Sequence, residues 1–366
     1  MQERTSLKAQ NRERSSKHRR GWRVTPRDLD ILVAIYRFRF LTRQLVEWAF
    51  FSREDGDFNQ RSSLAARRLQ VLFEAGYVQR LVMPVLPGTG RSPAVYALNS
   101  RGADAVAVHL GVDRGEVDWT PKHNRATAFF MEHTMAIARL WASLTAALRG
   151  TGFRIGLWEG EAELRRWEMR GYDRESGRTI PIRPDGYMEL MWPDESFAPF
   201  FIEVDMGTET NTRVGRKMGA YGDLRREGTR QEWDLAKFYV LIVTSGHRRM
   251  ENLRRVARKA GAQRFCFFAT LEDLHPSRVL TAWHNANNKG IRLIGSSERE
   301  SGGEEGKQKD GEEPGDNEIG KREDFAEGRF DAVKVSYQVD KDEEDDDASH
   351  DHGAYYDDED PETWPE

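Results

Sequence analysis

A mixed α/β (α+β) protein is predicted from two features of the chain. Apolar residues recur at helical spacing from residue 25 to about residue 76, whereas short apolar runs typical of strands follow Gly150. Helical segments interrupt those runs, and strands that alternate with helices in this way favour a mixed sheet covered by helices on both faces. The 366 residues leave room for two modest domains and for tails.

Charge is distributed unevenly along the chain. Residues 1–294 carry 48 Lys and Arg residues against 34 Asp and Glu residues, whereas residues 295–366 carry 8 against 27. A basic body indicates a polyanionic partner, most often nucleic acid, although an ordinary solvated surface is the alternative.

Both ends have the composition of disordered segments. Residues 1–23 carry eight basic and two acidic side chains and are expected to form a flexible basic arm. Residues 295–366 are expected to form a disordered acidic tail, which includes the acidic run from Asp342 to Asp347. One hypothesis is that this tail competes with DNA for the basic body, and a solubilising tail is the alternative.

The first predicted domain spans residues 24–111 and begins with helices. Thr25 can cap a helix whose first residue is Pro26. A second, shorter helix is expected from Leu41 to about Phe50. The third is expected to end at Gly76 and to bury an apolar stripe made of Leu64, Leu69, Leu72 and Phe73.

Two strands are expected after these helices, at residues 77–84 and 93–98, joined by a turn at residues 87–91. Three helices followed by a two-stranded hairpin is the order of a winged helix-turn-helix, in which the third helix enters the major groove of DNA. This order predicts double-stranded DNA as a partner. The residues expected to contact it lie on the third helix and at the hairpin tip: Arg61, Ser62, Arg67, Arg68 and Arg91. Helices used for protein contacts are the alternative.

A further helix is expected to run to about Leu110, and the polar residues 112–127 are interpreted as a linker to a second domain, residues 128–294. That domain is expected to begin with a helix whose apolar stripe runs from Met131 to Leu148. The strands expected after it are residues 153–158, 180–192, 197–205, 238–243 and 264–268, and the helices expected among them are residues 212–226 and 247–260.

Two carboxylates lie at matching positions in this second domain. Asp185 and Glu203 are each nine residues from residue 194, the centre of the turn between two apolar runs. In an antiparallel hairpin centred there, the two side chains face each other about 5 Å apart at Cβ. Like charges this close share a proton, pair with a cation or coordinate a metal. A Mg²⁺ site is one interpretation, and a turn aspartate beside a strand-end glutamate held by Arg183 or Lys217 is the alternative.

These residues also carry a resemblance to known families. An α/β core whose second and third strands carry an aspartate and then Glu-x-Lys resembles the PD-(D/E)XK nuclease superfamily, which has a restriction-endonuclease-like fold. Pro184-Asp185 and Glu203-Val204-Asp205 occupy those places over residues 128–270. With the winged helix, the segment 159–165, and the pair Lys217 and Tyr221, the chain is similar to the replication-relaxation family of bacterial plasmids and integrative elements over about residues 25–270.

The resemblance implies roles for particular residues. In the nuclease superfamily two acids hold Mg²⁺ and a lysine orients the nucleophile. Asp185 and Glu203 would then be the metal ligands, and Asp205 stands where the lysine is expected and adds a third carboxylate. Lys217, on the following helix, would be the substitute for that lysine. Glu132 and Glu161 are weaker candidates for a further acidic ligand.

Three functions follow as expectations. The first is a DNA-binding accessory or initiator protein of a bacterial plasmid or integrative-conjugative element, which acts in replication or in origin relaxation and mobilisation with relaxase or replication proteins as partners. The alternatives are a Mg²⁺-dependent nickase targeted by the winged helix and a winged-helix transcriptional regulator. The single cysteine, Cys266, and the lack of a signal peptide or an apolar span indicate a cytoplasmic protein with no membrane partner.

Overall fold

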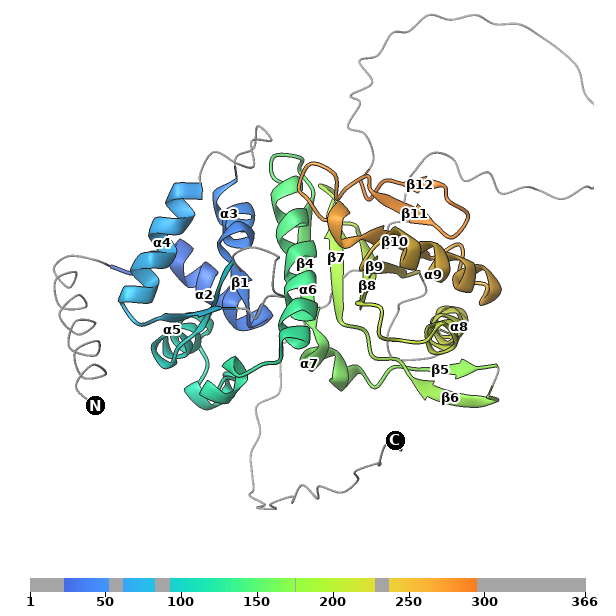
Figure 1. Ribbon diagram of the computed structural model, residues 1–366, viewed down its shortest axis with the longest axis horizontal. Coiled ribbons are helices and arrows are strands. Elements are labelled where there is room, and N and C mark those ends of the chain that lie inside the picture. Colours follow the sequence, from blue (N-terminus) through green and yellow to red (C-terminus); the bar gives the residue numbers. More distant parts are fainter. Residues whose placement is uncertain (1–22, 53–61, 83–92, 175, 228–236, 295–366) are drawn as a thin grey trace, which may run out of the picture. The chain divides into compact units, whose positions relative to one another are not determined.

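The computed structural model describes residues 23–52, 62–82, 93–174, 176–227 and 237–294 (Figure 1). The expected acidic tail and, apart from Arg23, the expected basic arm lie outside these residues, as do Arg61 and Arg91. Helices and a seven-stranded mixed sheet make up the described part of the chain, so the predicted mixed α/β class is confirmed.

The N-terminal elements follow one another as helix, strand, helix, helix, strand, strand. They are α2 (Pro26–Phe38), β1 (Leu41–Thr42), α3 (Arg43–Phe51), α4 (Ser62–Glu74), β2 (Val78–Val82) and β3 (Ala94–Leu98). The strands form one antiparallel sheet in the order β1-β3-β2. The helices and the hairpin were expected, whereas β1 was not, because two residues give no readable alternation.

Helix α2 begins where the sequence predicts. The Thr25 hydroxyl accepts a hydrogen bond from the Asp28 backbone, and the Asp28 carboxylate accepts one from the Thr25 backbone N–H at 2.6 Å. This reciprocal pair satisfies two N–H groups that lack partners within the helix. Asp28 is fully buried, so it needs a further partner for its charge.

The buried face of α4 differs from the predicted stripe. Ala65, Leu69 and Leu72 are buried, but Leu64 and Phe73 are 38% and 37% exposed. The prediction was therefore wrong for these two residues. Ala65 takes the inward position instead.

Residues 112–127, predicted as a linker, pack against the helices before them. Helix α5 (Ser100–Leu110) is followed by two short 3₁₀ helices, η1 (Arg114–Glu116) and η2 (Pro121–Asn124). Val117 and Trp119 between them are buried, and the Asn124 side-chain amide donates to the Leu98 carbonyl at 2.7 Å. This segment is thus an ordered part of the N-terminal unit.

The second half of the chain is built on the seven-stranded sheet. Its strands are β4 (Arg154–Gly160), β7 (Gly186–Met191), β8 (Phe197–Asp205), β9 (Tyr239–Thr244), β10 (Cys266–Thr270), β11 (Trp283–Asn285) and β12 (Gly290–Ile291). They lie in the order β12-β11-β10-β9-β8-β7-β4, and β9 is parallel to both β8 and β10 while the other pairs are antiparallel.

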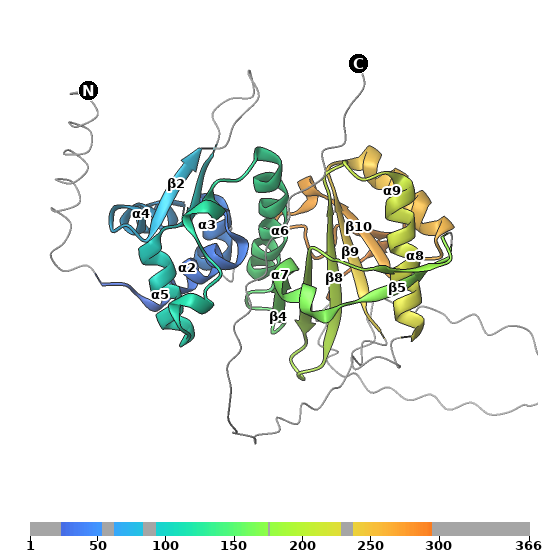
Figure 2. The same ribbon diagram turned by 90° about the horizontal axis from the view of Figure 1, so that it is seen from below.

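Helices cover both faces of this sheet, as predicted. Helix α6 (Ala128–Ala147) lies on one face, and α8 (Asn211–Glu227) and α9 (His247–Lys259) lie on the other (Figure 2). The remaining elements are α7 (Glu161–Leu164) and two further 3₁₀ helices, η3 (Arg165–Trp167) and η4 (Leu271–Asp273). None of the helices in the described part of the chain combines the length and hydrophobicity that a membrane crossing requires.

The predicted strand at residues 180–192 is in fact two strands in different sheets. Its first part is β6 (Arg178–Pro181), which pairs with β5 (Arg170–Asp173) in a separate two-stranded sheet. Pro181 and Pro184 have no N–H group to continue a ladder, which explains the break before β7. Gly171 lets β5 lie against α8, because a Cβ there would be 2.2 Å from the Ala220 carbonyl oxygen.

Candidate functional site

The hairpin that carries the two carboxylates has the predicted register. Gly186 lies opposite Ile202 and Met191 opposite Phe197, so the hairpin is centred at residue 194. Asp185 lies just before β7, and its N–H donates to the Ile202 carbonyl at 2.9 Å. Its carboxylate accepts from the Val204 N–H at 2.7 Å. The Asp185 side chain therefore occupies the end of the β7–β8 ladder beside Glu203.

Glu203 is held by two residues of α8. The Lys217 ammonium forms an ion pair with Oε2, and the Tyr221 hydroxyl donates to Oε1 at 2.5 Å. The Glu203 side chain is only 14% exposed. Lys217 was expected near this carboxylate and lies beside it, whereas the contact of Tyr221 with it was not predicted.

Local features of α8 explain this geometry. The Thr210 hydroxyl accepts from the Arg213 N–H at 3.3 Å at the start of the helix. Lys217 and Tyr221 are four residues apart and so share one face. The Tyr221 ring packs on the Phe201 ring of β8, with centroids 5.7 Å apart, which aims the hydroxyl at Glu203 two residues further along the strand.

Burial dominates the electrostatics of this group. It raises the pKa of Glu203 to about 7; Lys217 opposes that rise and Asp185 adds to it. Burial works against the charged form of Lys217, but Glu203 and Asp185 outweigh it, and the pKa of Lys217 is raised. The ammonium therefore stays charged, while Glu203 exchanges its proton close to neutral pH.

His133 of α6 belongs to this group and was not predicted. Its Nε2 lies 3.3 Å from Asp185 Oδ2. Burial disfavours the imidazolium, but Asp185, the Val204 carbonyl and Glu161 favour it, and the pKa of His133 is raised. The sequence could have indicated His133, because it lies three residues before buried Ala136 and so on the same face of the helix. The prediction selected the neighbouring Glu132 instead, and that residue is exposed.

Asp205 has a partner of its own. Arg249 of α9 donates to it from Nε at 2.9 Å and from Nη2 at 2.7 Å, and the Gly207 N–H donates at 2.7 Å. A bidentate guanidinium neutralises a carboxylate and fixes its orientation. Asp205, expected as a third carboxylate beside Asp185 and Glu203, has its charge matched by Arg249. Glu161 forms an ion pair with Arg165 at 2.9 Å on the exposed start of α7.

The side chains as arranged do not fit a divalent cation. Both carboxylate oxygens of Glu203 already accept hydrogen bonds. Asp185 Oδ2 accepts one from the Val204 N–H and lies 3.3 Å from His133 Nε2. Within the described ranges, no three His, Cys, Asp or Glu side chains are grouped as metal ligands. The cavity beside Glu203 measures about 30 Å³, which is room for a water molecule. A Mg²⁺ ion would require Lys217 and Tyr221 to leave Glu203.

Of the two neighbouring arginines on α4, Arg67 points to solvent and Arg68 is paired with Asp28. Arg67 is exposed. Arg68 was predicted to reach DNA, but its Nε and Nη2 both donate to the fully buried Asp28 carboxylate of α2. Its role is therefore corrected to that of an internal counterion, because a buried carboxylate requires one. Of the other predicted DNA contacts, Arg61, Arg91 and the Ser62 side chain lie outside the described residues.

One comparison with known proteins gives a match. The replication-relaxation family model matches residues 32–240, which is more than half of the 366 residues. The match begins within α2 and ends within β9, so it includes both the α4 surface and the residues around Glu203. No curated protein and no solved structure matches the chain.

Proposed function

Because this chain belongs to the replication-relaxation family, we propose that it is a DNA-binding accessory or initiator protein of a bacterial plasmid or integrative element. Membership supports a role in the replication or relaxation of mobile elements. The finer parts of the proposal are DNA binding through the N-terminal unit, assembly with relaxase or replication proteins, and a cytoplasmic location.

The observation that carries the DNA-binding proposal is the surface of α4. The helix–strand–helix–helix–strand–strand order, with β1 paired to β3, supports the winged helix interpretation of the N-terminal unit. In such a unit the third helix enters the major groove. Here that helix is α4, which exposes Arg67 together with Ser63 and Leu64. These are side chains of the kinds that contact phosphates and thymine methyl groups.

The group around Glu203 favours a binding or assembly role for the second domain over cleavage. Lys217 and Tyr221 together satisfy a buried carboxylate, and Arg249 satisfies Asp205. Buried charges that are matched in this way hold α8 and α9 in a fixed position on the sheet. A rigid second domain of this kind suits a surface that recruits partners.

A Mg²⁺-dependent nickase is the second candidate, and one observation favours it. Asp185, Glu203 and Lys217 converge at one end of the β7–β8 ladder closely enough for Asp185 to influence the pKa of both other groups. The same three residue types serve metal-dependent phosphodiester cleavage. This reading requires the ion pair between Glu203 and Lys217 to open when metal binds.

DNA binding by the full chain tests the proposal. Affinity for origin duplexes is measured over a range of salt concentrations for the wild type and for Arg67→Gln. The variant should bind more weakly, with a slope of log affinity against log salt reduced by about one unit. Arg125→Gln is the matched control, because Arg125 is exposed on the segment after η2. Equal effects of the two substitutions would reject α4 as the DNA-reading helix.

A further inference from the structure

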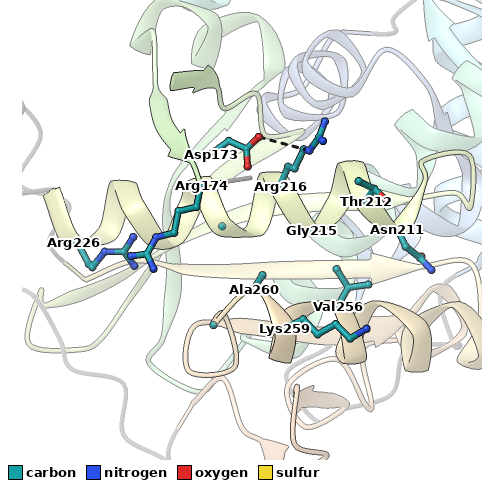
Figure 3. Close-up of a pocket in the computed structure, with 12 residues that line it drawn as sticks. Asp173, Arg174, Asn211, Thr212, Gly215, Arg216, Arg226, Val256, Lys259 and Ala260 are labelled. Carbon is teal, nitrogen blue, oxygen red and sulfur yellow. Dashed lines mark ion pairs between the residues drawn. The ribbon is translucent and has the colours of Figure 1, made fainter. Parts of the chain in front are cut away.

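A groove whose charged lining side chains are mostly cationic lies between α8, α9 and the end of β5 (Figure 3). Its volume is about 610 Å³, within the range of roughly 300–1,000 Å³ typical of ligand sites. It is separate from the Glu203 group, with which it shares no lining residue. The side chains that give it its charge are Arg174, Arg216, Arg226 and Lys259, against the single carboxylate of Asp173.

The one carboxylate that lines the groove already has hydrogen-bond and ion-pair partners. Asp173 is buried, and its Oδ2 accepts from the Ser176 N–H at 3.3 Å and the Ser176 hydroxyl at 2.6 Å. Arg216 lies 3.6 Å from the same oxygen. Asp173 therefore positions Arg216 at the groove and leaves the groove with excess positive charge.

Two of the groove's cations have no counterion among the residues that the structure describes. Arg174 and Lys259 are exposed, and neither has an ion-pair or hydrogen-bond partner for its side chain within the described residues. Arg226 is paired with Asp223 at 3.0 Å but remains half exposed. Such a concentration of unmatched charge in one concave surface attracts anions.

The charges are spread along the groove. Figure 3 shows Arg174 and Arg226 near one end and Asn211 at the other, with Arg216 and Lys259 between them on opposite walls. Arg216 and Arg226 are ten residues apart on α8, which corresponds to about 15 Å along the helix axis. Measured along the duplex axis, the phosphates of one DNA strand follow one another every 3.4 Å, so about 15 Å covers about four of them. The arrangement suits a line of negative charges better than one compact anion.

The wall of the groove contains a glycine that packing does not explain. A Cβ at Gly215 would lie 3.1 Å from Val256, so the contact of α8 with α9 accounts for that glycine. A Cβ at Gly219 would meet nothing within 4 Å. Glycine within a helix is unfavourable relative to alanine, and it permits close approach of another chain to the helix backbone. Gly219 keeps the groove open between its cationic side chains.

We propose that this groove binds the phosphodiester backbone of DNA, as a second contact surface in addition to α4. The proposal rests on the proposed DNA-binding function and adds a site to it. Arginine forks form paired hydrogen bonds with phosphate oxygens, and the polar side chains Asn211 and Thr212 supply further groups of the kinds that contact phosphates. Phosphate contacts position the protein on the duplex without reading its sequence.

Charge removal in the full chain tests this site. The double variant Arg174→Gln/Lys259→Gln removes the two side chains with no counterion in the described part of the chain, and Arg125→Gln/Lys289→Gln removes the same charge from exposed positions outside the groove. For a duplex of random sequence, the groove variant should bind about tenfold more weakly near physiological salt, with the salt slope reduced by about two units. The control should change both quantities by less than half as much.

Filling the groove provides a second readout. Gly219→Leu should raise the melting temperature, because the helix gains a better helix former at a position with open space, and it should weaken DNA binding by obstructing the groove. Gly219→Ala should raise the melting temperature with a smaller loss of binding. Opposite changes in stability and affinity cannot come from damage to the fold.

The outcomes separate this proposal from the one it rests on. If Arg67→Gln binds DNA more weakly than the wild type and the groove variant does not, the groove site is overturned and the α4 proposal stands. DNA binding by the groove variant that is as tight as wild type or tighter would also overturn the groove site. Wild type that binds no duplex at any salt concentration would reject the proposed function itself.

Discussion

Arg68 of α4 and Asp28 of α2 form an ion pair in which both carboxylate oxygens accept from one guanidinium. Asp28 is fully buried and Arg68 is 25% exposed. Burial alone would raise the pKa of Asp28, but Arg68 and Thr25 lower it. The pair fixes the helix proposed to contact DNA against the first helix of its domain.

Loss of Arg68 should therefore destabilise the protein. Arg68→Ala leaves a buried carboxylate without its counterion, and we expect a loss of about 2 to 4 kcal/mol in the free energy of unfolding. Arg67→Ala, at the neighbouring exposed position, should change it by less than about 0.5 kcal/mol. Urea unfolding of both variants measures the difference. Equal stabilities would show that Arg68 is not an internal counterion.

Stability should fall with rising pH around neutrality because of Glu203. Its pKa is about 7 in the folded protein against 4.5 for an ordinary glutamate. Between these values the folded state binds more protons than the unfolded state. The stability that Glu203 contributes is therefore fully present below pH 4.5 and is lost as pH rises through 7. The loss assigned to this group is at most about 3 to 4 kcal/mol. Thermal unfolding from pH 4.5 to 8 measures it.

Glu203→Gln is the control for that pH dependence. The amide keeps the shape of the side chain and removes its titration, so the decline between pH 4.5 and 7 should become shallower than in the wild type. The comparison concerns the slope, because Lys217 loses its main counterion in the variant and absolute stability also changes. An unchanged slope would mean that another group causes the decline.

The contact between His133 and Asp185 should be visible in the titration of His133. Burial lowers its pKa and Asp185 raises it, with a net rise. Asp185→Asn removes the raising influence and leaves the burial, so the pKa of His133 should fall below that of the wild type. NMR titration of histidine-labelled protein measures the change, with His133→Gln to assign the signal. A His133 pKa that is the same in both proteins would contradict the contact.

Cleavage of supercoiled plasmid DNA separates the two candidate functions. Wild type is incubated with Mg²⁺ beside Asp185→Ala and Glu203→Ala. Because donors occupy Glu203 in the structure, we expect no nicking above that of the two variants. Nicking by the wild type that is lost in both variants would establish the nickase and show that the ion pair between Glu203 and Lys217 opens on metal binding.

Local patterns in the sequence predicted much of this structure. Counting outward from residue 194 gave the register of β7 and β8, since hairpin pairing is fixed by the position of its turn. The cap at Thr25 was likewise predictable, because it depends on a spacing of three residues that helix geometry determines.

Contacts between distant parts of the chain were not predictable in the same way. Arg68 and Asp28 are 40 residues apart, and Arg249 and Asp205 are 44 apart. Arg68 was interpreted as a surface charge and Arg249 was not singled out. The partner of each is determined by how the helices pack and not by local spacing in the sequence. The β5–β6 hairpin was missed for a related reason: its strands are short and polar, and they depend on packing against α8.

Site-specific cross-linking tests the central claim most directly, namely that α4 lies on DNA. The only cysteine, Cys266, is fully buried, so a photo-cross-linker can be attached selectively at Ser63→Cys on the exposed face of α4 and, as a control, at Asn287→Cys on the turn between β11 and β12. We predict that the label at position 63 cross-links to bases of an origin duplex and that the label at position 287 does not. Cross-linking from position 287 with none from position 63 would contradict the account.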